Sequence, residues 1–442
     1  MQQPQAQPAE KFSEKFTDHA VNGVNPTEQT ADFVAAHRTE DVRQLALKAK
    51  RVEGLDLPLA LDQIAGWQIA CKKLPQWASC EGIIYPPHIS MEQCSSQFTA
   101  QYKSEIAQTL LTPAVTVRAR MSDSPESDTL VARSSMVDLT GGFGVDFSYL
   151  ARGFSQATYV ERQRHLCDLA EHNMAALGLD QARIVCGDGV EYLRQMDPVD
   201  FIYLDPARRD EHGSRTYAIE DCTPNVLELR DLLLAKSQCT LVKLSPMLDW
   251  RKAVADFDGT VREVHIVATG NECKELLLVL GQQVHEEPSA PRVFCVNDNQ
   301  RIDYDSAAYT QGLRIGGKPL PETKNYLYEP NASIMKAGCF DLVEERFGVT
   351  QVGPSSHLFV SATSVADFPG RGFAIEAIGG MNKKDIKRLL NGTKQANIAV
   401  RNFPLTAPQL RKKLKLADGG PVYLFGTTMQ GCDHVLLRTS KI

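Results

Sequence analysis

The spacing of apolar residues changes along the 442-residue chain. Between about residues 11 and 125, apolar and polar positions alternate at helical spacing, as in "TADFVAAHRTEDVRQLALKAKRV". From about 131 to 283, short β-rich runs such as "SMVDLT", "ATYVE" and "DFIYLD" alternate with helical segments. Such alternation is typical of a parallel sheet with helices on both faces. The pattern predicts a helical N-terminal domain followed by a doubly wound α/β domain.

Two polar segments divide the chain further. "MSDSPESDTL" (121–130) and "HEEPSAP" (285–291) both contain proline and no apolar periodicity. After the second, the sequence indicates smaller mixed α/β units. We expect a multidomain α/β protein with four domains: 1–125, 126–283, 284–360 and 361–442.

Composition narrows the class of protein. Hydrophobic residues make up 43% and charged residues 23%, as in ordinary globular proteins. No run is long and apolar enough for a membrane span, and "MQQPQAQPAEKFSEKF" lacks the apolar centre of a secretory signal, so we expect a cytoplasmic protein. The eleven cysteines show no Cys-x-x-Cys spacing, and no His-Glu-x-x-His occurs. Reduced thiols and no metal site are predicted.

Candidate chemistry begins at "MVDLTGGFGVD" (136–146). A strand is predicted to end at Asp138, and the following turn contains Gly141, Gly142 and Gly144. Glycines there let the backbone approach a ligand at the carboxyl end of the sheet. The turn alone is a weak signal, because any tight strand-to-helix connection can use glycines.

The next three predicted strands also end at carboxylates. Glu161 closes "ATYVE", Asp188 follows "RIVCG", and Asp205 ends "DFIYLD". Glu161 lies 23 residues beyond Asp138, where an acidic residue can bind a ribose diol. Acids scattered at random through loops would not fall at four consecutive strand ends.

These residues resemble the nucleoside-binding set of class I S-adenosylmethionine-dependent methyltransferases over about 150 residues. The resemblance implies a Rossmann-like domain with S-adenosylmethionine as cofactor. It assigns Asp138 and the Gly141–Gly144 turn to the methionine and ribose end, Glu161 to the ribose hydroxyls, and Asp188 with Gly189 to the adenine edge. Thr140 stands where a glycine is usual in the family. A nicotinamide dehydrogenase is the competing interpretation, but the full G-x-G-x-x-G spacing is absent.

The stretch "FIYLDPARRD" (201–210) is the predicted acceptor site. In base-modifying members of the family, an acidic or amide residue followed by prolines and an aromatic holds an exocyclic amine. Asp205 and Pro206 fit the first part of that pattern, but the stacking aromatic is missing. Arg208 and Arg209 are candidates for binding a substrate phosphate, and pairing with nearby surface acids is the alternative.

Hydroxyl methylation is a second possibility. Asp205, Lys243 in "LVKLSP" and Glu272 or Glu275 resemble part of the Lys-Asp-Lys-Glu set of ribose 2′-O-methyltransferases, with Lys103 a weak candidate for the first lysine. A salt bridge between Lys243 and Asp205 is the simpler explanation. Methylation at C5 of a pyrimidine is disfavoured, because no cysteine follows Pro206 closely.

The C-terminal region is basic. Residues 371–419 contain eleven Lys/Arg and three Asp/Glu, a local charge of 11 − 3 = +8 in a chain of net charge −6. Two predicted helices present basic residues opposite an apolar face. The candidate substrate-binding residues there are Lys383, Lys384, Lys387, Arg388, Arg411, Lys412 and Lys413. Phosphate binding and a merely solvated surface are the two interpretations.

This region also resembles the THUMP-like domain of a group of bacterial methyltransferases, through "NKKDIKRLL", "NIAVRNFPL", "LRKKLKL" and "GGPVYLFGT". Residues 326–348 resemble the small ferredoxin-like unit found beside it, and "EQCSSQFTAQYK" (92–103) extends the likeness. The resemblance implies RNA as partner. We therefore expect a methyltransferase acting on structured RNA, rRNA or tRNA, with an exocyclic amine favoured over a ribose 2′-oxygen. The alternatives are a protein or small-molecule methyltransferase and an inactive binder of S-adenosylmethionine or RNA.

Overall fold

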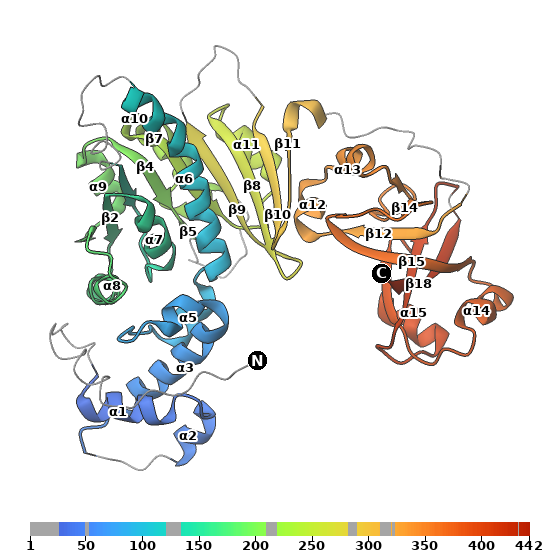
Figure 1. Cartoon of the computed structure of the whole chain (residues 1–442), viewed down its shortest axis with the longest axis horizontal. Helices are drawn as coiled ribbons and strands as arrows, with labels where there is room; N and C mark the ends of the chain where they lie inside the picture. Colours follow the sequence, from blue (N-terminus) through green and yellow to red (C-terminus); the bar gives the residue numbers. More distant parts are fainter. Residues whose placement is uncertain are drawn as a thin grey trace. The chain divides into compact units, whose positions relative to one another are not determined.

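The computed structural model describes residues 26–48, 53–120, 134–208, 219–281, 290–309, 320, 323–431 and 433–442, apart from the side chains of 88, 89, 112–120 and 208. Figure 1 shows the helices and strands in order along the chain. The chain divides into two compact units, one formed by residues 1–261 with 277–288 and the other by 262–276 with 289–442.

The first unit begins with helices, as the apolar spacing predicts. Thr27 and Asp56 start the first and third of them by accepting hydrogen bonds from Thr30 N and Leu59 N through their side chains. The helices are α1 (Glu28–His37), α2 (Val42–Lys48), α3 (Leu57–Lys73), α4 (Pro75–Ser79), α5 (His88–Gln93) and α6 (Gln97–Arg120).

A parallel sheet follows in the same unit. Its strands lie in the order β7-β4-β1-β2-β3, and each neighbouring pair is parallel. The strands are β1 (Ser135–Asp138), β2 (Gln156–Glu161), β3 (Ala182–Cys186), β4 (Val199–Leu204) and β7 (Ser237–Leu244). The reversal of chain order on either side of β1 makes this a doubly wound sheet, with ligands expected at the strands' carboxyl ends.

Helices and short elements connect these strands. They are α7 (Val145–Leu150), η4 (Ala151–Gly153), α8 (Arg164–Ala176), α9 (Gly189–Gln195), β5 (Ala207–Arg208), η5 (Ile219–Asp221), β6 (Cys222–Thr223), α10 (Val226–Lys236) and α11 (Trp250–Asp256). Two further strands, β8 (Val261–Thr269) and β9 (Glu272–Gly281), include the points at which the chain divides between the units.

The N-terminal helical region packs directly on the α/β domain. Trp77 is fully buried, and its indole N–H donates to Ser148 Oγ at 3.1 Å. The Asn173 side chain accepts from Ile84 N and donates to Ile84 O, each at 2.9 Å. Because these partners are buried, the contacts fix the helical region against α7 and α8.

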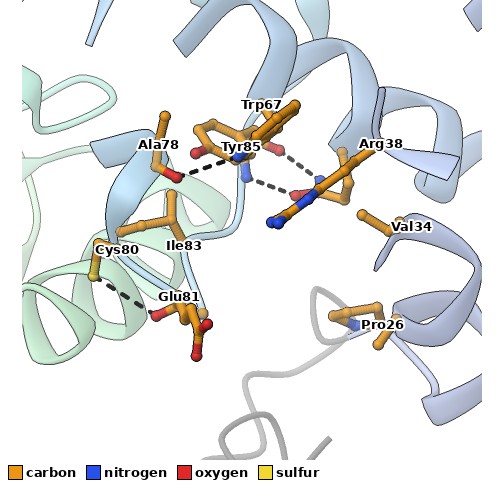
Figure 2. A pocket seen from close by; sticks show the side chains of 12 residues that line it. Pro26, Val34, Arg38, Trp67, Ala78, Cys80, Glu81, Ile83 and Tyr85 are labelled. Atoms are coloured by element: carbon orange, nitrogen blue, oxygen red, sulfur yellow. Dashed lines mark hydrogen bonds between the residues drawn. The ribbon is translucent and has the colours of Figure 1, made fainter. Parts of the chain in front are cut away.

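A pocket lies within the helical region, lined by residues of α1, α3 and the segment 78–85 (Figure 2). The Arg38 guanidinium lies over the Trp67 ring, 4.8 Å from its centroid, and the Trp67 indole N–H donates to Ala78 O at 3.2 Å. Gln63 and the Tyr85 backbone exchange two hydrogen bonds of 2.8 Å. None of the predicted site residues lines this pocket.

The second unit contains a seven-stranded sheet in the order β13-β14-β12-β15-β18-β17-β16. Its strands are β12 (Tyr326–Pro330), β13 (Thr350–Gln351), β14 (Phe359–Ser361), β15 (Gly370–Gly379), β16 (Asn397–Arg401), β17 (Val422–Thr428) and β18 (His434–Lys441). Separately, β10 (Arg292–Asn297) pairs in parallel with β8 and antiparallel with β11 (Gln300–Asp305). The remaining elements are η6 (Ser306–Tyr309), α12 (Ala332–Ala337), α13 (Phe340–Phe347), α14 (Lys383–Leu390) and α15 (Ala407–Leu414).

The two basic helices cover one face of the seven-stranded sheet. Successive strand residues alternate between faces, so Leu424 belongs to a core with Leu389 of α14 and Leu410 of α15, while Phe425 belongs to the core on the other face. The apolar side of each predicted helix therefore faces the sheet. The prediction of a multidomain α/β protein with helices at its N-terminus is confirmed.

Candidate active site

Four carboxylates lie at the carboxyl ends of neighbouring parallel strands, as the sequence pattern predicts. Asp138 ends β1 and Glu161 ends β2. Asp188 follows β3, and Asp205 follows β4 directly. Because β3, β2, β1 and β4 are adjacent in this order, these side chains line one edge of the sheet.

The turn after β1 needs its glycines. Gly142 and Gly144 have φ angles of 55° and 85°, which L-residues with side chains rarely adopt. A Cβ on Gly141 would lie 2.2 Å from the Tyr159 ring. The Tyr159 hydroxyl donates to Gly142 O, so the ring that excludes a side chain also holds the turn.

Glu161 is held by two backbone groups. The residue is 9% exposed, its Oε2 accepts from Gly142 N at 3.1 Å, and its Oε1 accepts from Gln163 N at 2.9 Å. A carboxylate fixed from two sides keeps its remaining lone pairs in a set direction. It can accept hydrogen bonds from a diol beside the glycine turn.

Asp188 has a structural task that the sequence pattern did not predict. Its Oδ1 accepts from Val190 N at 2.9 Å and Glu191 N at 3.1 Å, which caps the N-terminus of α9. The next residue, Gly189, allows a close approach to β1, because a Cβ there would lie 2.1 Å from Leu139 O. The loop after β3 is thereby fixed against the loop after β1.

Asp138 and Thr140 connect the cofactor turn to the loop after β4. Asp138 is 1% exposed, and this burial raises the pKa of its carboxyl well above the ordinary value. The hydrogen bond from Thr140 N lowers the pKa in part, whereas the negative charges of Asp146 and Asp205 raise it further. Thr140 Oγ1 accepts from Asp205 N at 2.7 Å. Thr140, which stands where the family usually has a glycine, thus fixes the backbone of Asp205, the predicted acceptor residue.

The predicted acceptor site is an ion pair open to one side. Lys243 Nζ lies 2.7 Å from Asp205 Oδ2; the lysine side chain is 15% exposed and the aspartate 41%. The adjoining Pro206 is buried. The salt bridge considered from the sequence is present, and Asp205 remains accessible to a substrate group.

Comparison with known proteins identifies the family. A crystal structure of a candidate methyltransferase from Porphyromonas gingivalis W83 is 31% identical to this chain, with a TM-score of 0.78, and the match covers 93% of this chain and 97% of that chain. The family model of a THUMP domain-like unit matches residues 370–441, and that of a ferredoxin-like domain matches 326–369. The chain belongs to the methyltransferases that carry a THUMP-like domain.

Other likenesses are partial. The model of the protein-L-isoaspartate(D-aspartate) O-methyltransferases matches residues 96–210 of this methyltransferase. An rRNA methylase from Streptococcus thermophilus is 14% identical over 40% of this chain and 96% of its own, with a TM-score of 0.27. An O-methyltransferase from Bacillus cereus, solved with S-adenosylhomocysteine, is 11% identical over 57% of this chain and 100% of its own, with a TM-score of 0.31. Searching the curated proteins gave no match.

S-adenosylmethionine is the cofactor of this class I methyltransferase, and the residues at the sheet edge fit it. The turn after β1 has no room for a side chain at Gly141, and the loop after β3 has none at Gly189. Between them lies the fixed carboxylate of Glu161. When bound, the cofactor supplies an electrophilic methyl group. The contribution of the chain is a shaped backbone and hydrogen-bond acceptors.

Asp146 and its hydrogen-bond partners, which lie beside the ion pair, were not predicted from the sequence. Asp146, in the first turn of α7, accepts from Ser95 Oγ at 2.8 Å and Tyr203 OH at 2.7 Å. Burial alone would raise the pKa of Asp146, but the ammonium groups of Lys103 and Lys243, together with these hydrogen bonds, lower it to about 2. Lys103 was a weak candidate from the sequence, and the structure brings it to this site.

Two predicted substrate residues lie beyond what the structure describes. Arg209 is outside the described residues, and of Arg208 only the backbone in β5 is described. Of the acids considered for hydroxyl activation, Glu272 pairs with Lys274 at 2.7 Å, and Glu275 is 4% exposed. The proposed phosphate contact of the two arginines stays a prediction.

The seven basic residues of α14 and α15 fall into two classes. Arg388 donates to Ile378 O at 2.6 Å and pairs with Asp385, and Arg411 pairs with Asp418 at 2.7 Å. The lysines are exposed and, within the described part of the chain, form no ion pair: Lys383, Lys384, Lys387, Lys412 and Lys413. The arginines bind their own domain, which leaves the lysines as candidates for an external partner.

The described residues contain neither a metal-site cluster nor a membrane-spanning helix. Among them, no group of three or more His, Cys, Asp or Glu side chains is placed to hold a metal ion. No helix in the described ranges is long and apolar enough to cross a membrane.

Proposed function

We propose that this methyltransferase modifies a nucleotide in structured RNA, rRNA or tRNA, in the cytoplasm. The observation that carries the proposal is the set of five exposed lysines on α14 and α15, which we call the lysine surface. Both helices cover the same face of the seven-stranded sheet. Exposed lysines that form no ion pair within the described residues, on helices that cover one face of a sheet, favour a polyanion bound through its phosphates.

The acceptor site favours an exocyclic amine. Asp205 is 41% exposed at the end of β4, and Thr140 fixes its backbone. Its carboxylate can accept a hydrogen bond from an amine N–H and so direct the nitrogen lone pair toward the methyl group. After the nitrogen–carbon bond forms, the same carboxylate can take the proton that the nitrogen releases.

Ribose 2′-oxygen methylation fits the site less well. It would need Lys243 as a neutral base to take the hydroxyl proton. The Lys243 ammonium instead lies 2.7 Å from Asp205 Oδ2 and 3.6 Å from Asp146 Oδ2. Two carboxylates at these distances stabilise the charged amine, which cannot accept a proton.

The test of RNA binding replaces the five residues of the lysine surface by glutamine. We expect weaker binding of total tRNA and rRNA fragments and a shallower dependence of log K on log salt, by about 0.7 to 0.9 for each phosphate that the variant no longer binds. The affinity for S-adenosylhomocysteine should stay unchanged, because the cofactor residues lie in the other unit. Filter binding at several salt concentrations measures the RNA affinity and its salt slope.

A matched control removes five exposed cations from other parts of the chain. These are Arg43, Lys48, Lys72, Arg183 and Arg262. The control should leave the salt slope nearly unchanged. If the two variants lower the slope equally, RNA contacts the chain without using the lysine surface, and the proposal is wrong.

Nucleoside mass spectrometry then identifies the acceptor. RNA from cells lacking the gene is incubated with the protein and labelled S-adenosylmethionine, and the digested nucleosides are compared with an untreated sample. A methyl group on an exocyclic amine supports the proposal, and one on a ribose oxygen contradicts the amine assignment. Cofactor binding with no labelled RNA would favour a protein or small-molecule substrate, or an inactive binder.

A further inference from the structure

Lys103 is buried to an extent that is rare for lysine. It extends from α6, and its side chain is 0% exposed. Its ammonium nitrogen lies 3.2 Å from Asp146 Oδ1, 3.3 Å from Ser95 Oγ and 3.2 Å from Thr99 O. A fully buried lysine is costly unless its charge is paired, so Asp146 is what makes the charged side chain tolerable at this position.

Asp146 has a second cation beside it. Lys243 Nζ is 3.6 Å from Asp146 Oδ2, but only 2.7 Å from Asp205 Oδ2. The hydroxyl of Ser95 lies between the two lysines, 3.3 Å from each ammonium nitrogen. Two ammonium groups therefore face two carboxylates. Lys103 is 3.2 Å from Asp146, and Lys243 is 2.7 Å from Asp205.

We propose that Lys103 is a positioning residue for the acceptor site. By neutralising Asp146, it leaves Lys243 paired with Asp205. The inference rests on the proposed function in one respect, the role of Asp205 as the group that holds the acceptor. It adds that the helical N-terminal region supplies part of the catalytic centre, through Ser95 and Lys103.

The direction of the effect follows from the charges. Within the described residues, Asp146 has Lys103 and Lys243 as its ion-pair partners. Without Lys103, the Asp146 carboxylate, which is only 10% exposed, would keep its hydrogen bonds from Ser95 and Tyr203 but have Lys243 as its one cationic partner among the described residues. Lysine has a flexible four-carbon stem, and a buried carboxylate attracts it more strongly than one that is 41% exposed to water. Lys243 should therefore turn from Asp205 to Asp146.

The test is K103M, which keeps most of the side-chain volume and removes the charge. In its crystal structure we expect Lys243 Nζ to lie beyond about 4 Å from Asp205 Oδ2, outside ion-pair distance. With labelled S-adenosylmethionine and RNA from cells lacking the gene, kcat should fall by roughly 10²-fold, because Asp205 would lose the partner that orients its carboxylate toward the acceptor. The dissociation constant for S-adenosylhomocysteine should not change.

The double variant K103M/D146N separates positioning from structural support. It removes the carboxylate that attracts Lys243, while the asparagine oxygen still accepts from Ser95 and Tyr203. Lys243 should return to Asp205, and kcat should recover to within about tenfold of the wild type. A residue needed only for folding would show no such recovery, because the double variant has lost a second native interaction.

K73M is the matched control. Lys73 lies in α3 of the same helical region, is partly buried, and donates to Met91 O at 3.0 Å and Glu92 O at 2.6 Å. Its loss should lower thermal stability without moving Lys243. Lys243 unmoved in K103M, or displaced in K103M/D146N, overturns the proposal. If K103M does not fold, the position of Lys243 in the double variant and in D146N decides alone: in both it must stay on Asp205.

The structural measurement needs no substrate. If no RNA is ever methylated, the proposed function fails while the position of Lys243 still tests this inference. If RNA is methylated and Lys243 does not move, the inference fails and the proposed function stands.

Discussion

Replacement of Glu161 by alanine tests the cofactor site most directly. The change removes a carboxylate whose two oxygens accept from Gly142 N and Gln163 N. It also removes the predicted partner of the ribose hydroxyls. We expect the glycine turn to keep its path, because the Tyr159 hydroxyl still donates to Gly142 O and Gly141 N still donates to Val160 O.

The magnitude follows from the hydrogen bonds that the ligand loses. In E161A, water can accept some of the hydrogen bonds that the ribose hydroxyls donate to the carboxylate. The net loss of binding free energy should therefore equal about one hydrogen bond to a charged acceptor, about 1 to 3 kcal/mol. This corresponds to a roughly 5- to 150-fold higher dissociation constant for S-adenosylhomocysteine. Isothermal titration calorimetry covers that range, and thermal unfolding checks that E161A remains folded.

A modified ligand tests whether Glu161 binds the ribose hydroxyls. An S-adenosylhomocysteine analogue without the 2′-hydroxyl should bind the wild type more weakly, but should bind E161A about as well as the parent ligand does. The control E191A alters an exposed glutamate that pairs with Arg194 on α9 and should leave affinity unchanged. Equal affinity of wild type and E161A for S-adenosylhomocysteine would refute the assignment of Glu161.

Two further predictions concern the acceptor side of the site. D205A should abolish methyl transfer in single-turnover assays, because the proposed role of Asp205 is to orient the acceptor. The affinity for S-adenosylhomocysteine should stay within about threefold, because the backbone N–H at 205 still donates to Thr140. T140A removes that hydrogen bond and should lower kcat roughly tenfold, with a smaller effect on cofactor affinity. T140S keeps the hydroxyl and should retain most of the wild-type rate. Equal rates for T140A and T140S would show that the hydrogen bond from Asp205 N to Thr140 does not support turnover.

The placement of the predicted cofactor residues could be read from the sequence because it obeys local rules. Asp138, Glu161, Asp188 and Asp205 each follow a short apolar run, and parallel strands bring such positions to one edge. The glycines are also readable, since a turn with positive φ angles requires them. The second role of Asp188, as the cap of α9, could have been read from its place before "GVEYL".

Only part of the acceptor half could be predicted: the pair of Asp205 and Lys243 was considered from the sequence, but the surroundings of Asp146 were not predicted. Lys103 and Ser95 precede Asp146 by 43 and 51 residues, and no spacing rule connects a helix to the first turn of another. Burial is what distinguishes Lys103 from the other lysines, and its immediate neighbours "QYKSE" are mostly polar. The same difficulty affects the basic helices, where a charge count cannot separate Arg388, bound to Ile378 O, from the exposed Lys387 beside it.

This difference between the two halves has a functional consequence. The predicted cofactor residues all lie within 138–189, on loops that the glycine turn and the cap of α9 fix locally. The acceptor side is assembled from α6, α7, β4 and β7, which meet only when the helical region is packed on the α/β domain. Loosening that packing, for example at Trp77, should therefore reduce turnover before it reduces cofactor binding. If Lys103 positions the acceptor site as proposed, methyl transfer should occur only in chains whose N-terminal helices are in place, and the helical region would then contribute to catalysis as well as to stability.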